Sequence, residues 1–553
     1  MAQLDEARTI SDTVAAHVAD HNQLHAKANY IFDVQDYGAT GDGVTDDTAA
    51  IQLAIDAAEA VTGIGVVSFP PQFRCVLSSG LTVDASGVHI EANGAKLLPD
   101  SAFKALSIAV ASASATTTID TDVHINQESV SVASASGITV GDLLRITSDT
   151  LWHYDNRSSL TKGELQRVAR ISGTDLYLEA MTADGYDVPG ETVTVAAYTP
   201  LTDIAVRRLR ITYAANANIG AMTLASTVGA VVEDVTITNA SVTGISLVSS
   251  YDASLSRVTI GSANRVSTGY GIQDSGCHGT QITDSRFREC RRGVDFSGSY
   301  PSRHGRVARC VVSGSGLASD ATDNYDQSSG VGTHGTAVNI VFESNTFLNC
   351  RIGVIVRGEG VTIRNNTFVG DSVNSINMSH GAGLVVVDNL VMSLYGPNTT
   401  DPTSPSGHNY KPNIFLDISS TVDSGSTFRV EGNEAYQLKA TFIKFGAATA
   451  SDVVVKDNVV ELFSNAGGNA TNFLLSASAT TLSNSYIAGN RVIDTNGTFT
   501  QLSGVTLDAT VVQVDPPTTV PEITGARDDG SALADLLTEL ETLGLITDSS
   551  TAS

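Results

Sequence analysis

The chain has 553 residues, 42% of them apolar, which is enough for more than one hydrophobic core, so several domains are expected. Its 59 acidic and 32 basic residues give a net charge of −27, which argues against binding nucleic acid or anionic lipid through bulk electrostatics. The N-terminal residues do not show the basic and then apolar pattern of a signal peptide, and no apolar run is long enough to span a bilayer. We therefore expect a protein that is made in the cytoplasm and does not insert into a membrane. The five cysteines are odd in number and form no CxxC motif, which predicts buried thiols.

Residues 1–31 carry a heptad pattern of about three repeats, with seam residues alternately four and three positions apart. The seam consists of Ile10, Val14, His17, His21, Leu24, Ala28 and Ile31. One interpretation is a short helix with solvated histidines. The other is the attachment stalk of a parallel homotrimer, with His17 and His21 near the axis holding an ion. Apart from that ion, we expect no cofactor and no metal.

The stretch YGATGDGVTDDTAAIQLAID, which starts at Tyr37, combines glycines and carboxylates ahead of a helical pattern. A P-loop is excluded because valine and threonine follow Gly43 in place of lysine and a hydroxyl residue. A calcium loop starting at Asp42 would place Asp47 where glycine is required. The dinucleotide pattern lacks its third glycine. The stretch therefore predicts a helix start, with Asp46 or Asp47 accepting hydrogen bonds from first-turn amides.

This stretch also carries a resemblance. The runs FDVQDYGATGDGVTDDTAAIQLAIDAA, VVSFPPQFRCV and GVHIEANGAKL resemble the N-terminal cap of pectate-lyase-like (pectin lyase superfamily) parallel β-helices, especially phage tail spikes. In that family the helix covers the open end of the solenoid, where free strand edges would otherwise pair with other chains. HVADHNQLHAKAN, near the N-terminus, resembles segments of phage minor tail proteins. The resemblance implies a cap and first rungs over 32–115 and a place in the virion, on the phage tail.

Residues 116–200 show alternating strands without a rung repeat, which predicts a small β-barrel-like insertion. Its KGE turn is similar to one in inserts of the same family. The insertion holds the only tryptophan of the chain, in the cluster Trp152, His153 and Tyr154. Core packing of the insertion and a platform for stacking sugars are the two interpretations, and we favour packing.

From 201 to 512 the sequence repeats, as in VEDVTI from Val232, FESNTF from Phe342 and IAGNRV from Ile487. Most intervals are 21 to 27 residues, a period that indicates a solenoid whose turns stack about 4.8 Å apart. The fold class is therefore all-β, a right-handed parallel β-helix with capping, stalk and C-terminal helices and one small β insertion. One repeat position predicts a structural asparagine ladder, because asparagine tolerates a left-handed conformation and can bond the next rung. The ladder comprises Asn345, Asn366, Asn389, Asn433, Asn458 and Asn490.

Three intervals, after Val307, Val386 and Val455, are long enough to form loops, where binding residues usually lie. The sequence of residues 513–553 predicts a proline-rich linker and then a helix with a leucine stripe over Leu533–Leu543. This stripe and the N-terminal seam each need an apolar partner. Because tail spikes of this resemblance trimerise side by side, we expect a homotrimer.

Four His-Gly turns, at His278, His304, His334 and His380, precede repeat strands and should occupy similar places on nearby rungs. CRRGVDFSG parallels CRIGVIVRG, which places Asp295 at the outward position of Ile355. An inverting glycosidase needs two carboxyls about 6.5–9.5 Å apart, a separation that one β-helix wall can supply.

The catalytic prediction pairs Asp295 with a carboxylate of the first long loop, Asp326 or Asp323. His304 and His334 would tune the acid or bind the sugar, and Arg303 would hold an acidic substituent. The predicted catalytic residues are Asp295, Asp326, His334 and His304. The predicted substrate-binding residues are Asp274, His278, Arg303, Asp323, Glu343 and Arg357. A lyase would instead need a base and an arginine or cation facing a uronate. The structural alternative is a solvated outward aspartate with turns that carry histidine by chance.

We expect a phage tail spike or minor tail protein that binds and depolymerises a host surface polysaccharide, as a hydrolase or a lyase, together with other tail proteins. The alternative is a receptor-binding or structural tail protein without activity, because the family hosts lyases, hydrolases and adhesins. A free secreted pectinolytic enzyme is a third hypothesis. The C-terminal segment SALADLLTELETLGLIT also resembles C-terminal tails of phage minor tail proteins. The missing signal peptide and these two tail-protein-like ends argue against the secreted enzyme.

Overall fold

The computed structural model describes residues 30–152, 160–265, 267–314, 329–370, 374–392, 414–419, 427–438, 441–446, 449–462, 472–494, 500–507 and 512–514. The stalk histidines His17 and His21, the loop residues Asp323 and Asp326, and the C-terminal leucine stripe lie outside these residues. In the described part, no helix is long and apolar enough to cross a membrane.

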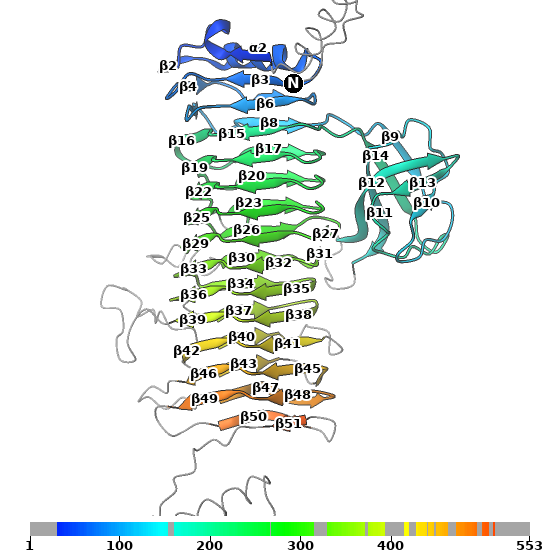
Figure 1. The fold of residues 1–553 in the computed structure, drawn as a ribbon, viewed down its shortest axis with the longest axis vertical. Helices are drawn as coiled ribbons and strands as arrows, with labels where there is room; N and C mark the ends of the chain where they lie inside the picture. Colours follow the sequence, from blue (N-terminus) through cyan, green and yellow to red (C-terminus); the bar gives the residue numbers. More distant parts are fainter. Residues whose placement is uncertain are drawn as a thin grey trace, which may run out of the picture.

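The described chain winds into a solenoid of three parallel sheets, here called A, B and C, which each turn visits in the order A, B, C (Figure 1). Sheet A contains β1 (Tyr30–Asp33), β3 (Gly65–Ser68), β6 (Val88–Glu91), β15 (Ala205–Arg207), β18 (Val231–Glu233), β21 (Ser254–Ser256), β24 (Gln281–Thr283), β27 (Ser302–Arg303), β28 (Arg306–Ala308), β31 (Ala337–Val338), β32 (Val341–Glu343), β35 (Glu359–Arg364), β38 (Ala382–Val387), β41 (Phe428–Glu431), β45 (Val453–Lys456), β48 (Tyr486–Ala488) and β51 (Val512–Val514). Sheet B contains β2 (Asp42–Asp46), β4 (Arg74–Leu77), β7 (Lys96–Pro99), β16 (Arg210–Ala217), β19 (Thr236–Ala240), β22 (Thr259–Gly261), β25 (Arg286–Arg288), β29 (Val311–Ser313), β33 (Thr346–Leu348), β36 (Thr367–Val369), β39 (Leu390–Met392), β42 (Glu434–Leu438), β46 (Val459–Leu462) and β49 (Arg491–Asp494). Sheet C contains β5 (Leu81–Val83), β8 (Leu106–Ala109), β17 (Gly220–Ala225), β20 (Thr243–Val248), β23 (Tyr270–Ser275), β26 (Arg292–Ser297), β30 (Ser329–Thr333), β34 (Ile352–Val356), β37 (Asn374–Met378), β40 (Ile414–Ile418), β43 (Thr441–Phe445), β44 (Thr449–Ser451), β47 (Asn472–Ser483) and β50 (Thr500–Leu507).

The rungs are held in register by inward columns of apolar side chains. In sheet C, Ile272, Val294, Val331 and Val354 stand on successive strands and are fully buried. A single rung cannot bury its own apolar face, so stacking is what removes these side chains from water. The predicted parallel β-helix is confirmed.

A helix closes the N-terminal end of the solenoid, where α2 (Thr48–Glu59) follows the short η1 (Val34–Tyr37) (Figure 1). Its face with Ile51 and Ile55 is buried in the main core. Of the two predicted capping residues, Asp46 accepts from the Thr48 amide at 3.0 Å. Asp47 lies at the cap position but accepts from the amides of the preceding loop instead, so it fixes the loop to the helix start.

The asparagine ladder runs along the turns between sheets A and B. The side-chain amide of Asn366 donates from Nδ2 to Asn389 Oδ1 at 3.0 Å, and Asn366 Oδ1 accepts from the Asn345 backbone amide at 2.9 Å. The predicted ladder is confirmed, but the left-handed residue is the one before each asparagine, such as Ser344 (φ 54°) and Asn365 (φ 55°). The ladder side chains therefore point inward and bond successive rungs.

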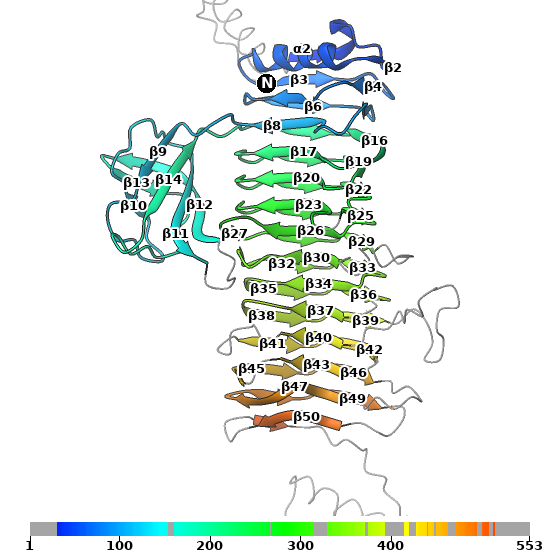
Figure 2. The same cartoon turned by 180° about the vertical axis from the view of Figure 1, so that it is seen from behind.

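The region predicted as an insertion forms a six-stranded antiparallel sheet that stands beside the solenoid (Figures 1 and 2). Its strands are β9 (Ala115–Thr118), β10 (Ser129–Ser131), β11 (Leu143–Leu151), β12 (Thr161–Ser172), β13 (Asp175–Leu178) and β14 (Val193–Tyr198). Leu143 and Leu165 pack against Tyr251 and Tyr300 of the solenoid. These contacts seat the insertion on the turns that lead from sheet C to sheet A.

Trp152 makes a second packing contact between the insertion and the solenoid. It is 2% exposed, packs with Leu160 of the insertion and Val338 of the solenoid, and donates Nε1–H to the Gly335 carbonyl. The tryptophan therefore serves packing, as favoured from the sequence, but at the junction of insertion and solenoid. All five cysteines are free and buried, as predicted.

Candidate active site

The strand β26 sets the orientation of the predicted catalytic aspartate. Val294 and Phe296 point into the core, so Asp295 between them points to the outer face of sheet C, as the repeat comparison predicts. Asp295 is nevertheless 0% exposed. The expectation of a solvated outward carboxylate is therefore wrong, because neighbouring side chains cover it.

The cover is a compact cluster of charges. Arg292 Nη1 donates to Asp295 Oδ1, and His334 Nε2 lies 3.3 Å from Asp295 Oδ2. The next rung places Gly332 opposite Asp295, where a Cβ would lie 3.4 Å from Arg292 Nη1. The missing side chain thus leaves the room that the arginine occupies.

The cluster fixes the protonation state of Asp295. Burial alone would raise the pKa of this carboxyl, but the charges of His334 and Arg292, with the hydrogen bond from Arg292, outweigh burial and hold the pKa well below its usual range. An ionised carboxylate cannot donate a proton as a general acid. It is suited to orient the His334 imidazole and to stabilise its positive charge.

His334 is the member of this pair that solvent reaches. It follows β30, and its side chain is 17% exposed while Asp295 behind it is enclosed. Arg357 follows β34, one rung further, and donates Nε–H to Ser379 Oγ at 3.0 Å. The structure therefore brings together three predicted residues, Asp295, His334 and Arg357, along one face of sheet C.

Asp274 is not available to a ligand in this structure. Its register on β23 places it between Leu247 and Phe296 in an inward column, and it is 1% exposed. Burial raises the pKa of this carboxyl, and the Cys277 amide donates to it at 3.4 Å. The predicted contact with substrate is contradicted by this inward orientation.

His278, His304 and Arg303 lie on the turns between sheets C and A. The His278 ring stacks on Tyr251 at 4.4 Å and meets the His304 ring edge-on at 5.0 Å. Burial lowers the pKa of His278 to about 4. Burial, with the nearby Arg303 charge, also lowers the pKa of His304. No contact joins either histidine to Asp295 within the described residues, so the structure does not place His304 in the cluster.

Arg303 has a partner on the insertion. It is 6% exposed, and its Nη2 lies 2.8 Å from Asp184 Oδ2. This ion pair joins the insertion to the solenoid, which gives Arg303 a structural contact in place of the predicted saccharide.

Glu343 belongs to a different face. It stands on sheet A between Arg306 and Arg364 and pairs with both. Burial disfavours its ionised form, but hydrogen bonds from the two arginines lower its pKa. The structure does not bring Glu343 to Asp295, and the roles predicted for Asp323 and Asp326 fall outside the described residues.

Sequence reasoning missed Arg292, which forms the ion pair with Asp295. The signal was present in the same repeat comparison, because Arg292 in CRRGVDFSG takes the place of Ile352 in CRIGVIVRG. A charged residue at a position that is apolar in the matching rung needs a partner, and the outward aspartate three residues later supplies it.

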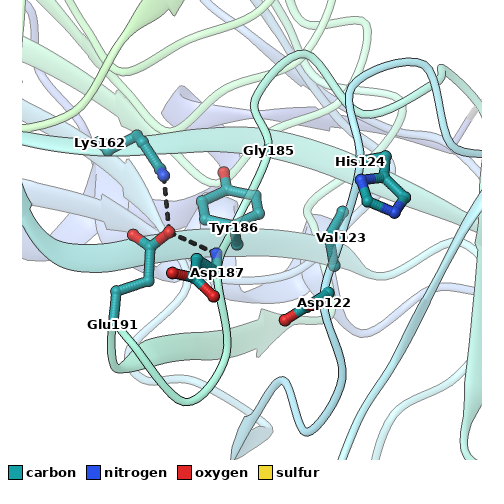
Figure 3. Close-up of a pocket in the computed structure, with 8 residues that line it drawn as sticks. All are labelled: Asp122, Val123, His124, Lys162, Gly185, Tyr186, Asp187 and Glu191. Carbon is teal, nitrogen blue, oxygen red and sulfur yellow. Dashed lines mark hydrogen bonds and ion pairs between the residues drawn. The ribbon is translucent and has the colours of Figure 1, made fainter.

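The insertion carries a separate polar hollow of about 240 Å³ (Figure 3). It is lined by Asp122, Val123, His124, Lys162, Gly185, Tyr186, Asp187 and Glu191. Its charged groups are largely matched internally, since Lys162 pairs with Glu191 at 2.7 Å and the Asp187 amide donates to the same carboxylate at 2.7 Å (Figure 3). Across the part of the chain that the structure describes, no cluster of His, Cys, Asp or Glu could hold a metal ion.

The fold is a right-handed parallel β-helix. Residues 220–393 match a family model described as right handed beta helix region, and residues 31–73 match one described as rhamnogalacturonase A/epimerase, pectate lyase-like. Among curated proteins, mannuronan C5-epimerase AlgE1 of Azotobacter vinelandii is 48% identical over 68 residues, which are 11% of this chain and 5% of the epimerase. AlgE5 of the same organism is 64% identical over 39 residues, 7% of this chain and 4% of its own length. The chain thus spans only a small part of these relatives.

Solved structures match over far more of the chain. The tailspike gp61 of Pseudomonas phage phi297 superposes with a TM-score of 0.57 at 18% identity, covering 87% of this chain and 81% of the tailspike. The tailspike gp49 of Pseudomonas phage LKA1 gives 0.54 at 17% identity, with 82% of each chain covered. The gp54 tailspike of Acinetobacter baumannii phage AP22 gives a TM-score of 0.50 at 13% identity, covering 94% of this chain and 81% of the tailspike. At these identities the likeness shows a shared fold.

Proposed function

We propose that this chain is a tail-spike-like protein that binds a bacterial surface polysaccharide and depolymerises it on the outer face of sheet C. The observation that carries the proposal is the enclosed Asp295 behind a partly exposed His334, 3.3 Å apart. The resemblance of the fold to tailspikes supports it, one of them solved in complex with a capsular saccharide.

In the proposed mechanism His334 exchanges the proton and Asp295 holds the imidazole. The ionised carboxylate favours the positively charged ring after it takes a proton, a contribution of about 10²–10⁴-fold for a positioned base. Arg292 keeps Asp295 ionised and in place. A base beside guanidinium groups fits β-elimination of a uronate. Hydrolysis needs a second carboxyl, the role predicted for Asp326.

The second candidate is an adhesin on the same fold. The complete burial of Asp295 and its pairing with Arg292 favour this candidate, because both features also suit a structural ion pair. The two candidates differ in whether a product forms.

The test incubates the full chain with purified envelope glycans of candidate hosts. New reducing ends are measured, together with the ultraviolet absorbance of an unsaturated product, which only a lyase generates. His334→Gln should abolish product formation while glycan binding persists. The matched control, His124→Gln on the insertion, should leave turnover unchanged. Binding without product from every host glycan would refute the depolymerase and favour the adhesin.

We also propose that the chain forms a homotrimer in the virion tail and meets other tail proteins there. The heptad pattern over 10–31 and the leucine pattern over 533–543 support the trimer, because each sequence pattern predicts an apolar helix face that needs a partner. Light scattering of the full chain should give a trimer mass at micromolar concentration. A stable monomer would refute the assembly.

A further inference from the structure

A groove lies along the edge where sheet B leads into sheet C. Its volume is about 620 Å³, within the range of about 300–1,000 Å³ that is common for ligand sites. It is lined by Asn218, Ile219, Gly220, Val242, Arg265, Ser267 and Thr268. These residues precede or begin β17, β20 and β23, so the groove crosses three successive rungs.

The lining combines an apolar base with a polar rim. Ile219 and Val242 are partly exposed, while Asn218, Ser267 and Thr268 are exposed. A sugar ring has the same two characters, with C–H groups on its faces and hydroxyls around its edge. Apolar walls with a few placed polar groups are typical of sites for small ligands.

Arg265 gives the groove its charge. It is exposed and makes no ion pair with any described residue, in a chain whose net charge is −27. Along sheet A, by contrast, Arg207 pairs with Glu91, and Arg306 and Arg364 both pair with Glu343. An arginine without a carboxylate of its own can take one from a ligand, through two parallel hydrogen bonds.

The groove adjoins the Asp295 cluster through Tyr270. The Tyr270 hydroxyl donates to the Ser267 carbonyl at 3.1 Å, at the groove. On the neighbouring strand Tyr270 stands in register with Arg292, one rung or about 4.8 Å away. A saccharide chain lying along this edge would reach the groove and the cluster together.

We propose that this groove is a subsite for a carboxylated sugar, with Arg265 binding the carboxylate and Ser267, Thr268 and Asn218 binding hydroxyls. The inference rests on the proposed polysaccharide binding and narrows the substrate to an acidic polysaccharide of the uronate class. The subsite binds and positions the chain, and it takes no part in the bond cleavage.

The test measures binding of galacturonate and mannuronate oligomers to the full chain by calorimetry, beside the same oligomers with their carboxyls reduced to alcohols. Arg265→Ala should weaken binding of the uronate oligomer that the chain prefers by about tenfold or more and leave binding of the reduced oligomer unchanged. Arg265→Lys should retain part of the affinity. The matched control is Arg286→Ala, an exposed arginine of β25 away from the groove, and it should bind like the unaltered chain.

Equal affinity of Arg265→Ala and the unaltered chain for the uronates would overturn the subsite, and so would equal affinity of the unaltered chain for charged and reduced oligomers. Binding that depends on Arg265 without cleavage of any oligomer would keep the subsite and count against the depolymerase. Cleavage of host glycan with no dependence on Arg265 would support the depolymerase and overturn the subsite. No binding of any oligomer overturns the subsite.

Discussion

Replacing Asp295 by asparagine should destabilise the central rungs strongly. The change keeps the shape of the side chain but removes its charge, and it leaves the Arg292 guanidinium, 2% exposed, without a counter-ion. Removing one partner of a buried ion pair typically costs about 3–5 kcal/mol, because the remaining charge is neither hydrated nor paired. We expect a loss in this range for Asp295→Asn.

The expected pH dependence follows from the lowered pKa of Asp295. A carboxyl whose folded pKa lies below its unfolded value of about 3.9 stabilises the fold above that value. Its contribution is lost as the pH falls through the folded pKa. The stabilisation that comes from ionisation of the Asp295 carboxyl should therefore persist down to about pH 4 and shrink only in stronger acid.

The assay is amide hydrogen exchange, because a long solenoid need not unfold in one step. Amides of β26 and β30 should lose protection in Asp295→Asn, whereas those of β6 (Val88–Glu91) should not. The double variant Arg292→Gln/Asp295→Asn removes both charges and should recover part of the loss. A cost below about 1 kcal/mol, the size typical of a surface charge, would refute the buried ion pair.

Three further changes test the ladder and the docking of the insertion. Asn366→Ala should cost about 3–5 kcal/mol, because it leaves several buried groups on two neighbouring rungs without their partners. Lowering the pH from about 6.5 to 4 should weaken docking of the insertion by at most about 3 kcal/mol. Burial lowers the pKa of His278 to about 4, and His278 stacks on Tyr251, against which the insertion packs, so the imidazole should protonate more readily when this contact opens. A red shift of Trp152 emission should report the opening, and His278→Gln should remove it. Arg303→Ala and Asp184→Ala should each weaken docking, with the double variant no worse than the poorer single one.

Each of these has a control and an opposing outcome. Asn377→Ala, at a partly exposed site on sheet C, should change stability little. A loss there equal to that of Asn366→Ala would refute the specific stabilising role of the ladder hydrogen bonds. An unshifted Trp152 spectrum down to pH 4 would refute the role of His278. Additive losses in the Arg303 and Asp184 cycle would show that the two side chains do not act as a pair.

The rung periodicity alone predicted the solenoid, the inward and outward faces and the outward orientation of Asp295. It could not predict that Asp295 is buried, because the covering groups come from its own strand and from the next turn, and Gly332 makes room for them. The same alignment of repeats also predicts the orientation of Asp274. Aligning its strand with β26 places it at the position of Phe296, which points inward, so the repeat itself predicts that Asp274 is buried.

Glu343 gives the complementary lesson. Its repeat, FESNTF, aligns with the strand of sheet A, so the sequence already assigned it to a different face from Asp295. Proximity along the chain suggested one site, but the next strand of a β-helix lies on another wall. The docking of the insertion was beyond sequence reasoning, because Arg303 and Asp184 are 119 positions apart and no repeat links them.

The seat of the insertion changes how the solenoid should respond to force. A stack of rungs that touch only their neighbours can peel apart one at a time from either end. Here one compact unit leaves the solenoid after β8, rejoins it at β15 and contacts three later turns, through Tyr251, Arg303 and Val338. Tension applied along the long axis would have to break these contacts between the insertion and the solenoid before those rungs could separate. The segment between β20 and β31 should therefore separate as one block, and the rungs beyond it, which lack contacts with the insertion, should open first.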